Sequence, residues 1–377
     1  MIAASRPGTD ARLKILSVFG TRPEAIKLAP VLAVLAREPE RFDSRICVTG
    51  QHGALLDQAL ASFGIRPHVD LAALAPGQSL AHLAATILER VDRLIAEERP
   101  DWVLVQGDTV SAMAGGLAAY LRQVRLGHVE AGLRSPLRDR PFPEEANRRI
   151  AALLATRHFA PSDSAAAHLR REGVPDEAIL VTGNTIVDAL RVARGVPGPG
   201  PALPAGFAGR RLVVVTMHRR ESLGAPLERV CEALLLLAER YRADTRFVWP
   251  LHHNPGVRLP LERRLGGHPT ICLLPPLDYH PMVKLLEQSF LLLTDSGGLQ
   301  EEGPLLGKPT LVLREETERD LCLAAGATRL VGTATERIVA EAARLLDDGT
   351  AHAAMAAAGV DLGDGRAAER IVAALGD

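Results

Sequence analysis

Short apolar runs alternate with helical patterns along the chain, and this alternation constrains the fold more than any other feature. Segments between the runs, such as Pro226–Arg240 and Glu336–Asp347, repeat apolar residues at a 3.6-residue spacing. The pattern predicts βαβ units and parallel sheets, hence an α/β protein with Rossmann-like domains. The expected strands are Lys14–Phe19, Ser44–Thr49, Trp102–Gln106, Arg125–Val129, His158–Ala160, Ala178–Thr182, Arg211–Thr216, Arg246–Pro250, Thr270–Leu274, Leu291–Thr294, Thr310–Leu313 and Arg329–Val331.

The length of 377 residues predicts two domains, each large enough for its own core. Residues 194–211 are crowded with proline and glycine and have no periodicity, which is typical of a linker. We expect a first domain over residues 12–193, a linker over 194–209, a second domain over 210–359 and a last helix within about 360–377.

Composition excludes several classes of function. The net charge of −1 gives no global attraction to nucleic acid or to an anionic membrane. No run is long enough to span a bilayer, and the first residues lack the apolar core of a signal peptide. The four cysteines form no CxxC pair, which disfavours structural zinc and disulfides and fits the cytoplasm.

Polar residues follow the strands where a parallel sheet would bind a ligand, at its carboxyl edge. Both predicted domains carry such an edge, and two edges facing each other would form one cleft. The residues are Gly20-Thr21-Arg22-Pro23-Glu24, Gly50-Gln51-His52, Gly107-Asp108-Thr109 and Glu130–Arg134 in the first domain, and Met217–Glu221 and Asp295–Gly298 in the second.

The first of these turns predicts a helix N-terminus. Thr21 and Glu24 have the spacing of a capping box, with Pro23 in the first helical turn. Arg22 and Lys27 are not explained by capping. They are either solvated surface cations or part of an anion site at the helix N-terminus. The chain has only four lysines beside forty arginines, which tilts the choice for Lys27 toward function.

The second predicted domain has two candidate phosphate-binding turns. Ser296-Gly297-Gly298 would open a helix whose free N–H groups can bind a phosphate, with Glu301 and Glu302 placed to bind ribose hydroxyls. An ordinary capped helix is the alternative. His218, followed by two arginines, indicates an anion site at the end of a strand.

Carboxylates gather in the first domain. Asp108 and Glu130 each end a strand in the first domain. Carboxylates that lie close together shift each other's pKa, which suggests general acid/base chemistry. Glu145 either joins them or pairs with Arg148 and Arg149 at helical spacing. The spacing offers no metal ligand set. Together the residues indicate a nucleotide-linked small molecule as substrate.

Seven motifs in this order resemble the non-hydrolysing UDP-N-acetylglucosamine 2-epimerases: VFGTRPEAIKLAP, GDT, GHVEAGLRS, PFPEEANRR, GNTIVDAL, HRRES and TDSGGLQEEGPLLGKP. The resemblance implies the GT-B arrangement of two Rossmann-like domains, an active site between them and a C-terminal helix returning to the first domain. It implies reversible conversion of UDP-GlcNAc to UDP-ManNAc without NAD or metal, by elimination of UDP to 2-acetamidoglucal and re-addition. A cytoplasmic homodimer is also implied.

The resemblance assigns roles to matching positions. The catalytic residues would be Asp108, Glu130, Glu145 and His218. Substrate would be bound by Arg22, Lys27, Arg134, Ser296, Gly297, Gly298, Glu302 and Arg319, with Glu302 at the ribose and Arg22, His218, Ser296 and Gly297 at the diphosphate. An allosteric UDP-GlcNAc site would include Gln51, His52 and His252.

Some positions depart from the family. Gln106 stands where a histidine is usual, Gly53-Ala54 where larger polar residues are common, and Asp320-Leu321 where Pro-Glu is usual. The difference at Asp320-Leu321 leaves open a modified UDP-2-acetamido sugar as substrate, and the difference at Gly53-Ala54 leaves open whether the allosteric site is retained. A GT-B glycosyltransferase, a hydrolysing epimerase and a non-catalytic sugar-nucleotide sensor are the competing functions.

Overall fold

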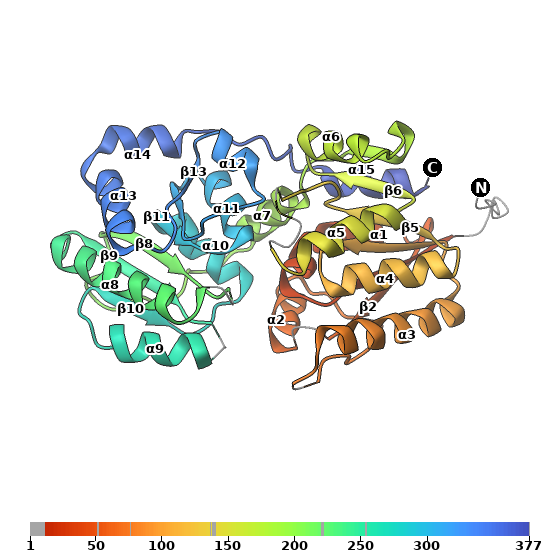
Figure 1. The fold of residues 1–377 in the computed structure, drawn as a ribbon, viewed down its shortest axis with the longest axis horizontal. Helices are drawn as coiled ribbons and strands as arrows, with labels where there is room; N and C mark the ends of the chain where they lie inside the picture. The colour runs from red at the N-terminus through yellow and green to blue at the C-terminus, as the bar shows by residue number, and fades with distance from the viewer. Residues whose placement is uncertain are drawn as a thin grey trace. The chain divides into compact units, whose positions relative to one another are not determined.

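The structure is a computed structural model that describes residues 12–50, 53–75, 77–135, 137, 141–219, 222–252 and 255–376. The chain forms two compact units (Figure 1). Unit 1 comprises Met1–Val192 and Leu362–Asp377, and unit 2 comprises Ala193–Asp361. Each unit has its own sheet, and the two sheets are described in turn.

Unit 1 is built on a seven-stranded parallel sheet of order β3-β2-β1-β4-β5-β6-β7. The direction of winding reverses between β1 and β4, which makes their carboxyl ends a topological switch point. The strands are β1 (Leu13–Phe19), β2 (Phe42–Val48), β3 (Val69–Asp70), β4 (Trp102–Gln106), β5 (Arg125–Val129), β6 (Arg157–Ala160) and β7 (Ile179–Val181).

Helices cover both faces of this sheet. Parallel crossovers are right-handed, so the reversal places α1 and α2 on one face and α3 and α4 on the other. Contacts join α3 to α4 and α4 to α5, and join α1 to α2 and α15 (Figure 1). The helices are α1 (Arg22–Arg37), α2 (Ala54–Ser62), α3 (Leu80–Glu98), α4 (Val110–Leu121), α5 (Glu144–Leu154), α6 (Asp163–Arg171), the 3₁₀ helix η1 (Asp176–Ala178), α7 (Thr185–Gly195) and α15 (Ala367–Gly376).

The end of the chain packs into unit 1 beside the start of α7. The Asn184 N–H donates to the Leu362 carbonyl at 2.7 Å. Asp188 caps α15 from outside, because its carboxylate accepts the N–H groups of Ala367 and Ala368 at 3.3 and 3.1 Å. These backbone groups at a helix N-terminus would otherwise lack an acceptor. The GNTIVDAL motif therefore anchors α15 in unit 1.

Unit 2 repeats the architecture with a six-stranded parallel sheet of order β10-β9-β8-β11-β12-β13. Its strands are β8 (Arg211–Thr216), β9 (Thr245–Pro250), β10 (Ile271–Leu274), β11 (Ser289–Thr294), β12 (Thr310–Val312) and β13 (Thr328–Leu330). Its helices are α8 (Ala225–Arg240), α9 (Pro255–Leu265), α10 (Tyr279–Gln288), α11 (Gly297–Leu305), α12 (Asp320–Ala324), α13 (Thr335–Asp347) and α14 (Gly349–Ala356).

The central strand β8 shows how a continuous apolar run serves two cores. Val213 and Val215 belong to the cluster that contains residues of α8, α9 and α13. Val214 points to the opposite face, where it packs with residues of α10. Successive side chains of a strand alternate between faces, so both faces being covered requires every position to be apolar.

The predicted α/β class with two Rossmann-like sheets is confirmed, and twelve of the strands lie where the apolar runs predict them. β3 was not predicted. The predicted linker over 194–209 begins inside α7, which runs to Gly195 and crosses from one compact unit to the other at Val192.

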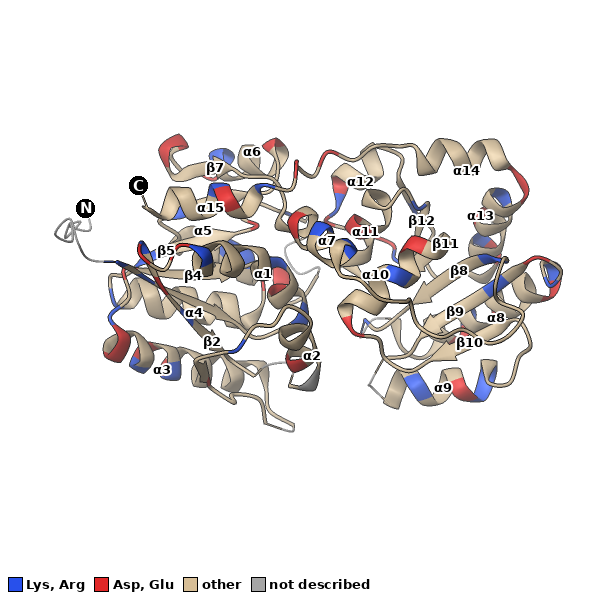
Figure 2. Cartoon of the chain, turned by 180° about the vertical axis from the view of Figure 1, so that it is seen from behind, with Lys and Arg blue, Asp and Glu red and all other residues tan. Residues whose placement is uncertain are grey.

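Charged residues of both signs are interspersed on the exposed helices. Figure 2 shows them alternating along α3 and α9, in keeping with the net charge of −1. No helix among the described residues has the length and apolar character needed to cross a membrane.

Candidate active site

The turn after β1 is fixed by Glu24. Thr21 is the N-cap of α1, and its hydroxyl and the Glu24 carboxylate complete the predicted capping box. Glu24 is 1% exposed and accepts the N–H groups of Gly20 and Thr21 at 3.0 and 2.7 Å. Its other oxygen accepts the Thr109 hydroxyl at 2.6 Å, which ties this turn to the turn after β4. Arg22, the first residue of α1, is half-buried in the turn that Glu24 fixes.

Burial dominates the electrostatics of Glu24. It raises the pKa of the carboxyl to about 7, although hydrogen bonds from Thr109, Gly20 and Thr21 act in the opposite direction. A carboxyl that joins both sides of the switch point therefore titrates near neutral pH.

Lys27 lies inside the unit and forms an ion pair with Glu130. Its side chain is 5% exposed, so the alternative of a solvated surface cation is wrong. Its Nζ contacts Glu130 Oε1, and Gln106 Nε2 donates to Glu130 Oε2. Glu130 has a φ of +63°, a left-handed conformation that is strained for a side chain other than glycine. The lysine and the amide hold the carboxylate at the end of β5.

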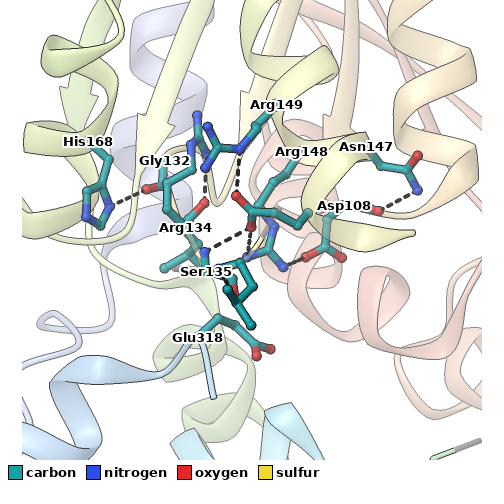
Figure 3. A network of polar contacts seen from close by, with 12 residues as sticks. Asp108, Gly132, Arg134, Ser135, Asn147, Arg148, Arg149, His168 and Glu318 are labelled. Carbon is teal, nitrogen blue, oxygen red and sulfur yellow. Dashed lines mark hydrogen bonds and ion pairs between the residues drawn. The ribbon is translucent and has the colours of Figure 1, made fainter. Parts of the chain in front are cut away.

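Asp108 and Glu145 share a guanidinium group. Arg148 of α5 contacts Asp108 Oδ2 through Nη2 and lies 3.3 Å from Glu145 Oε2 through Nη1 (Figure 3). Asn147 Nδ2 donates to the Asp108 carbonyl at 3.0 Å, which fixes the turn itself. The structure thus brings together two of the predicted carboxylates, at the end of β4 and at the start of α5.

Glu145 is fully buried and has partners on both oxygens. Oε1 accepts Arg149 Nε at 2.8 Å, and Oε2 accepts the Ser135 N–H at 3.0 Å (Figure 3). The predicted pairing with Arg148 and Arg149 is therefore confirmed. That pairing also holds Glu145 beside Asp108, so it does not argue against an acid/base role.

Arg134 forms a two-pronged pair with Glu172, which follows α6. Its Nε and Nη2 donate to the two carboxylate oxygens at 2.8 and 2.5 Å, and Nη1 donates to the Leu133 carbonyl at 2.7 Å. The side chain is 6% exposed. Its three donor nitrogens thus contact protein groups, and substrate binding by Arg134 stays a prediction.

His128 supports the turn that carries Asp108. Its Nε2 lies 2.7 Å from the Gly107 carbonyl, and Gly107 has a φ of +68°, which favours glycine. Burial lowers the pKa of His128 to about 4, so the ring is neutral near pH 7.

In unit 2, His218 is held by Asp295. The imidazole Nδ1 lies 3.2 Å from Asp295 Oδ1, and the backbone N–H groups of His218 and Arg219 both donate to Oδ2 at 2.9 Å. Burial alone would raise the pKa of Asp295. The hydrogen bond from the His218 side chain, the charge of that side chain and the two backbone N–H groups together lower this pKa to about 2. A buried anion thus orients an imidazole that is 39% exposed.

Asp295 is among the polar residues expected at the carboxyl edge because it directly follows an apolar run, but the sequence predicts no role for it. A carboxylate beside a histidine favours the proton on the ring nitrogen that faces it, here Nδ1, and a ligand contact through His218 stays a prediction.

The N-terminus of α11 lies among arginines. Ser296 is its N-cap, and Gly297 and Gly298 open the helix, as predicted. A Cβ built on Gly297 would lie 3.5 Å from Arg219 Nη2, 3.8 Å from Arg319 Nη2 and 3.5 Å from Glu318 Oε1, a carboxylate oxygen that lies 4.0 Å from Arg219 Nη2. Free N–H groups and cations at a helix N-terminus favour an anion, and the Glu318 carboxylate offsets part of this positive charge.

The acidic residues of α11 are buried. Glu301 pairs with Arg319, with Oε1 3.1 Å from Nε. Glu302, the predicted ribose ligand, is 5% exposed. Both residues are therefore almost fully buried, and ribose binding by Glu302 stays a prediction.

Comparisons with known proteins decide the family. A family model described as UDP-N-acetylglucosamine 2-epimerase matches residues 35–376. The chain belongs to the UDP-N-acetylglucosamine 2-epimerase family. The prediction of an epimerase is confirmed at this level.

Relatives of this epimerase family match over nearly their whole length. UDP-N-acetylglucosamine 2-epimerase of Salmonella typhimurium is 45% identical over 371 residues, covering 96% of this chain and 98% of that protein. The crystal structure of UDP-GlcNAc 2-epimerase from Neisseria meningitidis, bound to UDP-GlcNAc, is 37% identical with a TM-score of 0.88 and covers 96% of this chain and 99% of that one. The glycosyltransferase SnogD from Streptomyces nogalater, at 19% identity and a TM-score of 0.60, shares the fold.

The predicted allosteric residues of this epimerase are only partly described. Gln51 and His52 lie outside the described residues. His252 is half-buried and stacks on His218, with ring centroids 5.6 Å apart. Its ring thus lies beside that of a predicted catalytic residue, and the allosteric role of His252 stays a prediction. Among the described residues, no cluster of His, Cys, Asp or Glu could hold a metal ion.

Proposed function

We propose that the chain catalyses the reversible C2 epimerisation of UDP-GlcNAc to UDP-ManNAc. The family membership supports the reaction class, and the structure of a relative bound to UDP-GlcNAc supports the substrate. The observation that carries the proposal is the joining of Asp108 and Glu145 through Arg148 at the carboxyl edge of the unit 1 sheet. Epimerisation at carbon requires removing a proton and returning it to the other face, which needs more than one acid/base group.

The proposed reaction is elimination followed by addition. A carboxylate takes the C2 proton, the C2–H electron pair forms the C1=C2 double bond, and the C1–O bond breaks with its electrons on the β-phosphate of UDP. The intermediate is 2-acetamidoglucal. A proton then adds to C2 from the opposite face as the UDP oxygen attacks C1. Atoms and charge balance without a redox cofactor.

Asp108, Glu130 and Glu145 would carry the proton transfers. Each is held by a neighbouring cation: Arg148 contacts Asp108 and Glu145, and Lys27 contacts Glu130. A carboxylate with a fixed orientation can meet C2–H in the transition state without first reorganising.

Unit 2 would bind the nucleotide end. The N-terminus of α11 at Ser296, Gly297 and Gly298, with His218, would take the diphosphate. This supports departure of UDP, because negative charge develops on the phosphate oxygen as the C1–O bond breaks. Further contacts would come from Arg22 and Arg319 to the diphosphate and from Glu302 to the ribose.

Deuterium incorporation tests the reaction. The protein is incubated with UDP-GlcNAc in deuterated water without acceptor or metal, and the C2–H signal of the sugar is monitored by NMR. We expect UDP-ManNAc to form with deuterium at C2. Free ManNAc accumulating with UDP would indicate a hydrolysing enzyme instead. Absence of exchange despite measurable binding would contradict the proposal, and UDP-linked 2,3-diacetamido sugars would then be assayed.

We also propose a cytoplasmic homodimer. The four cysteines are free, which favours a reducing compartment. The neighbouring helices α4 and α5 expose Tyr120, Leu121, Ile150 and Leu153, the last at 83%, and such a face favours a second copy as its cover. We expect sedimentation as a dimer of 40.3 kDa chains and a shift to monomer for Leu153→Glu. A monomeric native chain would contradict the proposal.

A further inference from the structure

Glu145 belongs to a chain of ion pairs that leads away from the proposed reaction centre. From Glu145 Oε1 the contacts run to Arg149 Nε at 2.8 Å, and from Arg149 Nη1 to Glu172 Oε1 at 3.4 Å. Glu172 then holds Arg134 through both carboxylate oxygens, at 2.8 and 2.5 Å. Charges alternate along the chain, so every ion contacts opposite charge.

The chain of contacts closes into a ring through the backbone. Arg134 is followed by Ser135, whose N–H donates to Glu145 Oε2 at 3.0 Å. Arg134 also binds the Leu133 carbonyl at 2.7 Å, which joins its guanidinium to the same loop (Figure 3). Glu172 therefore reaches Glu145 by two routes, through Arg149 to one oxygen and through Arg134 and the loop to the other.

Burial differs around this ring. Glu145 is fully buried and the Arg134 side chain is 6% exposed, whereas the side chains of Glu172 and Arg149 are 35% and 41% exposed. An exposed Arg149–Glu172 pair alone would contribute little. The two-pronged bond to Arg134 changes this, because it fixes the Glu172 carboxylate in place. That hydrogen bond from Arg134 also lowers the pKa of Glu172, so its charge persists at neutral pH.

We propose that Glu172 is a positioning residue for the epimerisation: it sets the orientation of the Glu145 carboxylate without touching substrate. The inference rests on the proposed acid/base role of Glu145. A buried carboxylate is sensitive to the placement of its partners, and a small rotation away from the C2 proton slows proton transfer steeply. Removing the charge of Glu172 loosens both routes while Glu145 itself is unchanged.

The test is Glu172→Gln, with Asp176→Asn as matched control. Asp176 pairs with Arg170 at 2.5 Å beyond the end of α6 and is 77% exposed, so the control removes the same charge from an ion pair outside the ring. We expect Glu172→Gln to lower kcat by about 10- to 100-fold with KM within about twofold, and to shift the pH profile of kcat. The control should match the native enzyme in all three.

Two further variants separate the routes. Arg149→Lys keeps the charge but loses the fork that contacts Glu145 and Glu172 together, and we expect a smaller fall in kcat. In the double variant Glu172→Gln/Arg149→Lys, kcat should fall by less than the product of the two single effects, because both substitutions act through one ring. Independent effects that multiply would contradict a shared route.

Failure of the inference is distinguishable from failure of the proposed function. Native-like kcat in Glu172→Gln, equal effects in Asp176→Asn, or a lower melting temperature with unchanged kcat would overturn the positioning role. A native enzyme inactive on UDP-GlcNAc would overturn the proposed function alone. A crystal structure of Glu172→Gln then decides the inference: Glu145 still bonded to Ser135 and Arg149 as before would overturn it.

Discussion

An Asp108→Asn enzyme is expected to bind UDP-GlcNAc with nearly native KM and to convert it about 10²- to 10⁴-fold more slowly. The amide keeps the size of the side chain but removes its negative charge and most of its basicity. Asn147 and Arg148 still contact the turn and Glu145. The loss should therefore fall on proton transfer rather than on the fold.

Asp92→Asn is the matched control. Asp92 also pairs with an arginine, Arg122, through two contacts of 2.5 and 2.6 Å, but this pair joins α3 to the end of α4 on the exposed surface. Losing such an exposed pair changes the free energy of unfolding little, and kcat should stay at its native value.

Deuterium exchange at C2 shows whether the Asp108→Asn substitution acts on proton transfer. In deuterated water, the exchange of C2–H in the Asp108→Asn enzyme should fall in parallel with UDP-ManNAc formation. If Asp108 serves only one face, exchange of one substrate would survive while net epimerisation stops. A kcat within about threefold of native would exclude Asp108 as an acid/base group.

The fold could be predicted because buried parallel strands are continuous apolar runs. Val213, Val214 and Val215 face two cores, so the run is visible without knowing its partners. β3, Val69–Asp70, is two residues long and half exposed, and so short a pairing leaves no pattern in the sequence.

The candidate site could be predicted only residue by residue. Asp108 and Glu130 follow strands, and this local position identified them. Glu172 follows α6 and has no local feature to mark it, because its importance comes from contacts with Arg134 and Arg149. These contacts join residues that are 23 and 38 positions apart in the sequence. They depend on how α5 and α6 pack, and periodicity does not specify that packing.

Acid is expected to destabilise unit 1 through two buried histidines. His128 and His158 are paired positions on β5 and β6, and they are 0% and 2% exposed. Burial lowers the pKa of each to about 4, and the neighbouring His128 lowers that of His158 further. In the unfolded chain both bind protons near pH 6.5.

The direction of this pH effect on stability follows from proton binding by the folded and unfolded chains. Between pH 6.5 and 4 the unfolded chain binds more protons at these sites than the folded chain, so the free energy of unfolding falls as pH falls. Each histidine contributes a slope of about 1.4 kcal/mol per pH unit, or about 3 kcal/mol over the window. Glu24 acts oppositely: its pKa is raised to about 7, so its contribution grows as pH falls from 7 to 4.5.

Replacing one histidine isolates the effect, since Glu24 is present in both proteins and cancels. We expect the unfolding free energy of the native chain, minus that of His158→Gln, to fall by about 3 kcal/mol from pH 6.5 to 4, measured by urea denaturation. His82→Gln on α3 removes an exposed histidine and should leave the difference flat. Since single domains are stable by only about 5–15 kcal/mol, this term is large enough to set where acid unfolding begins. A pH-independent difference for His158→Gln would show that His158 does not resist protonation in the folded chain, and acid sensitivity would then have to come from the paired carboxylates.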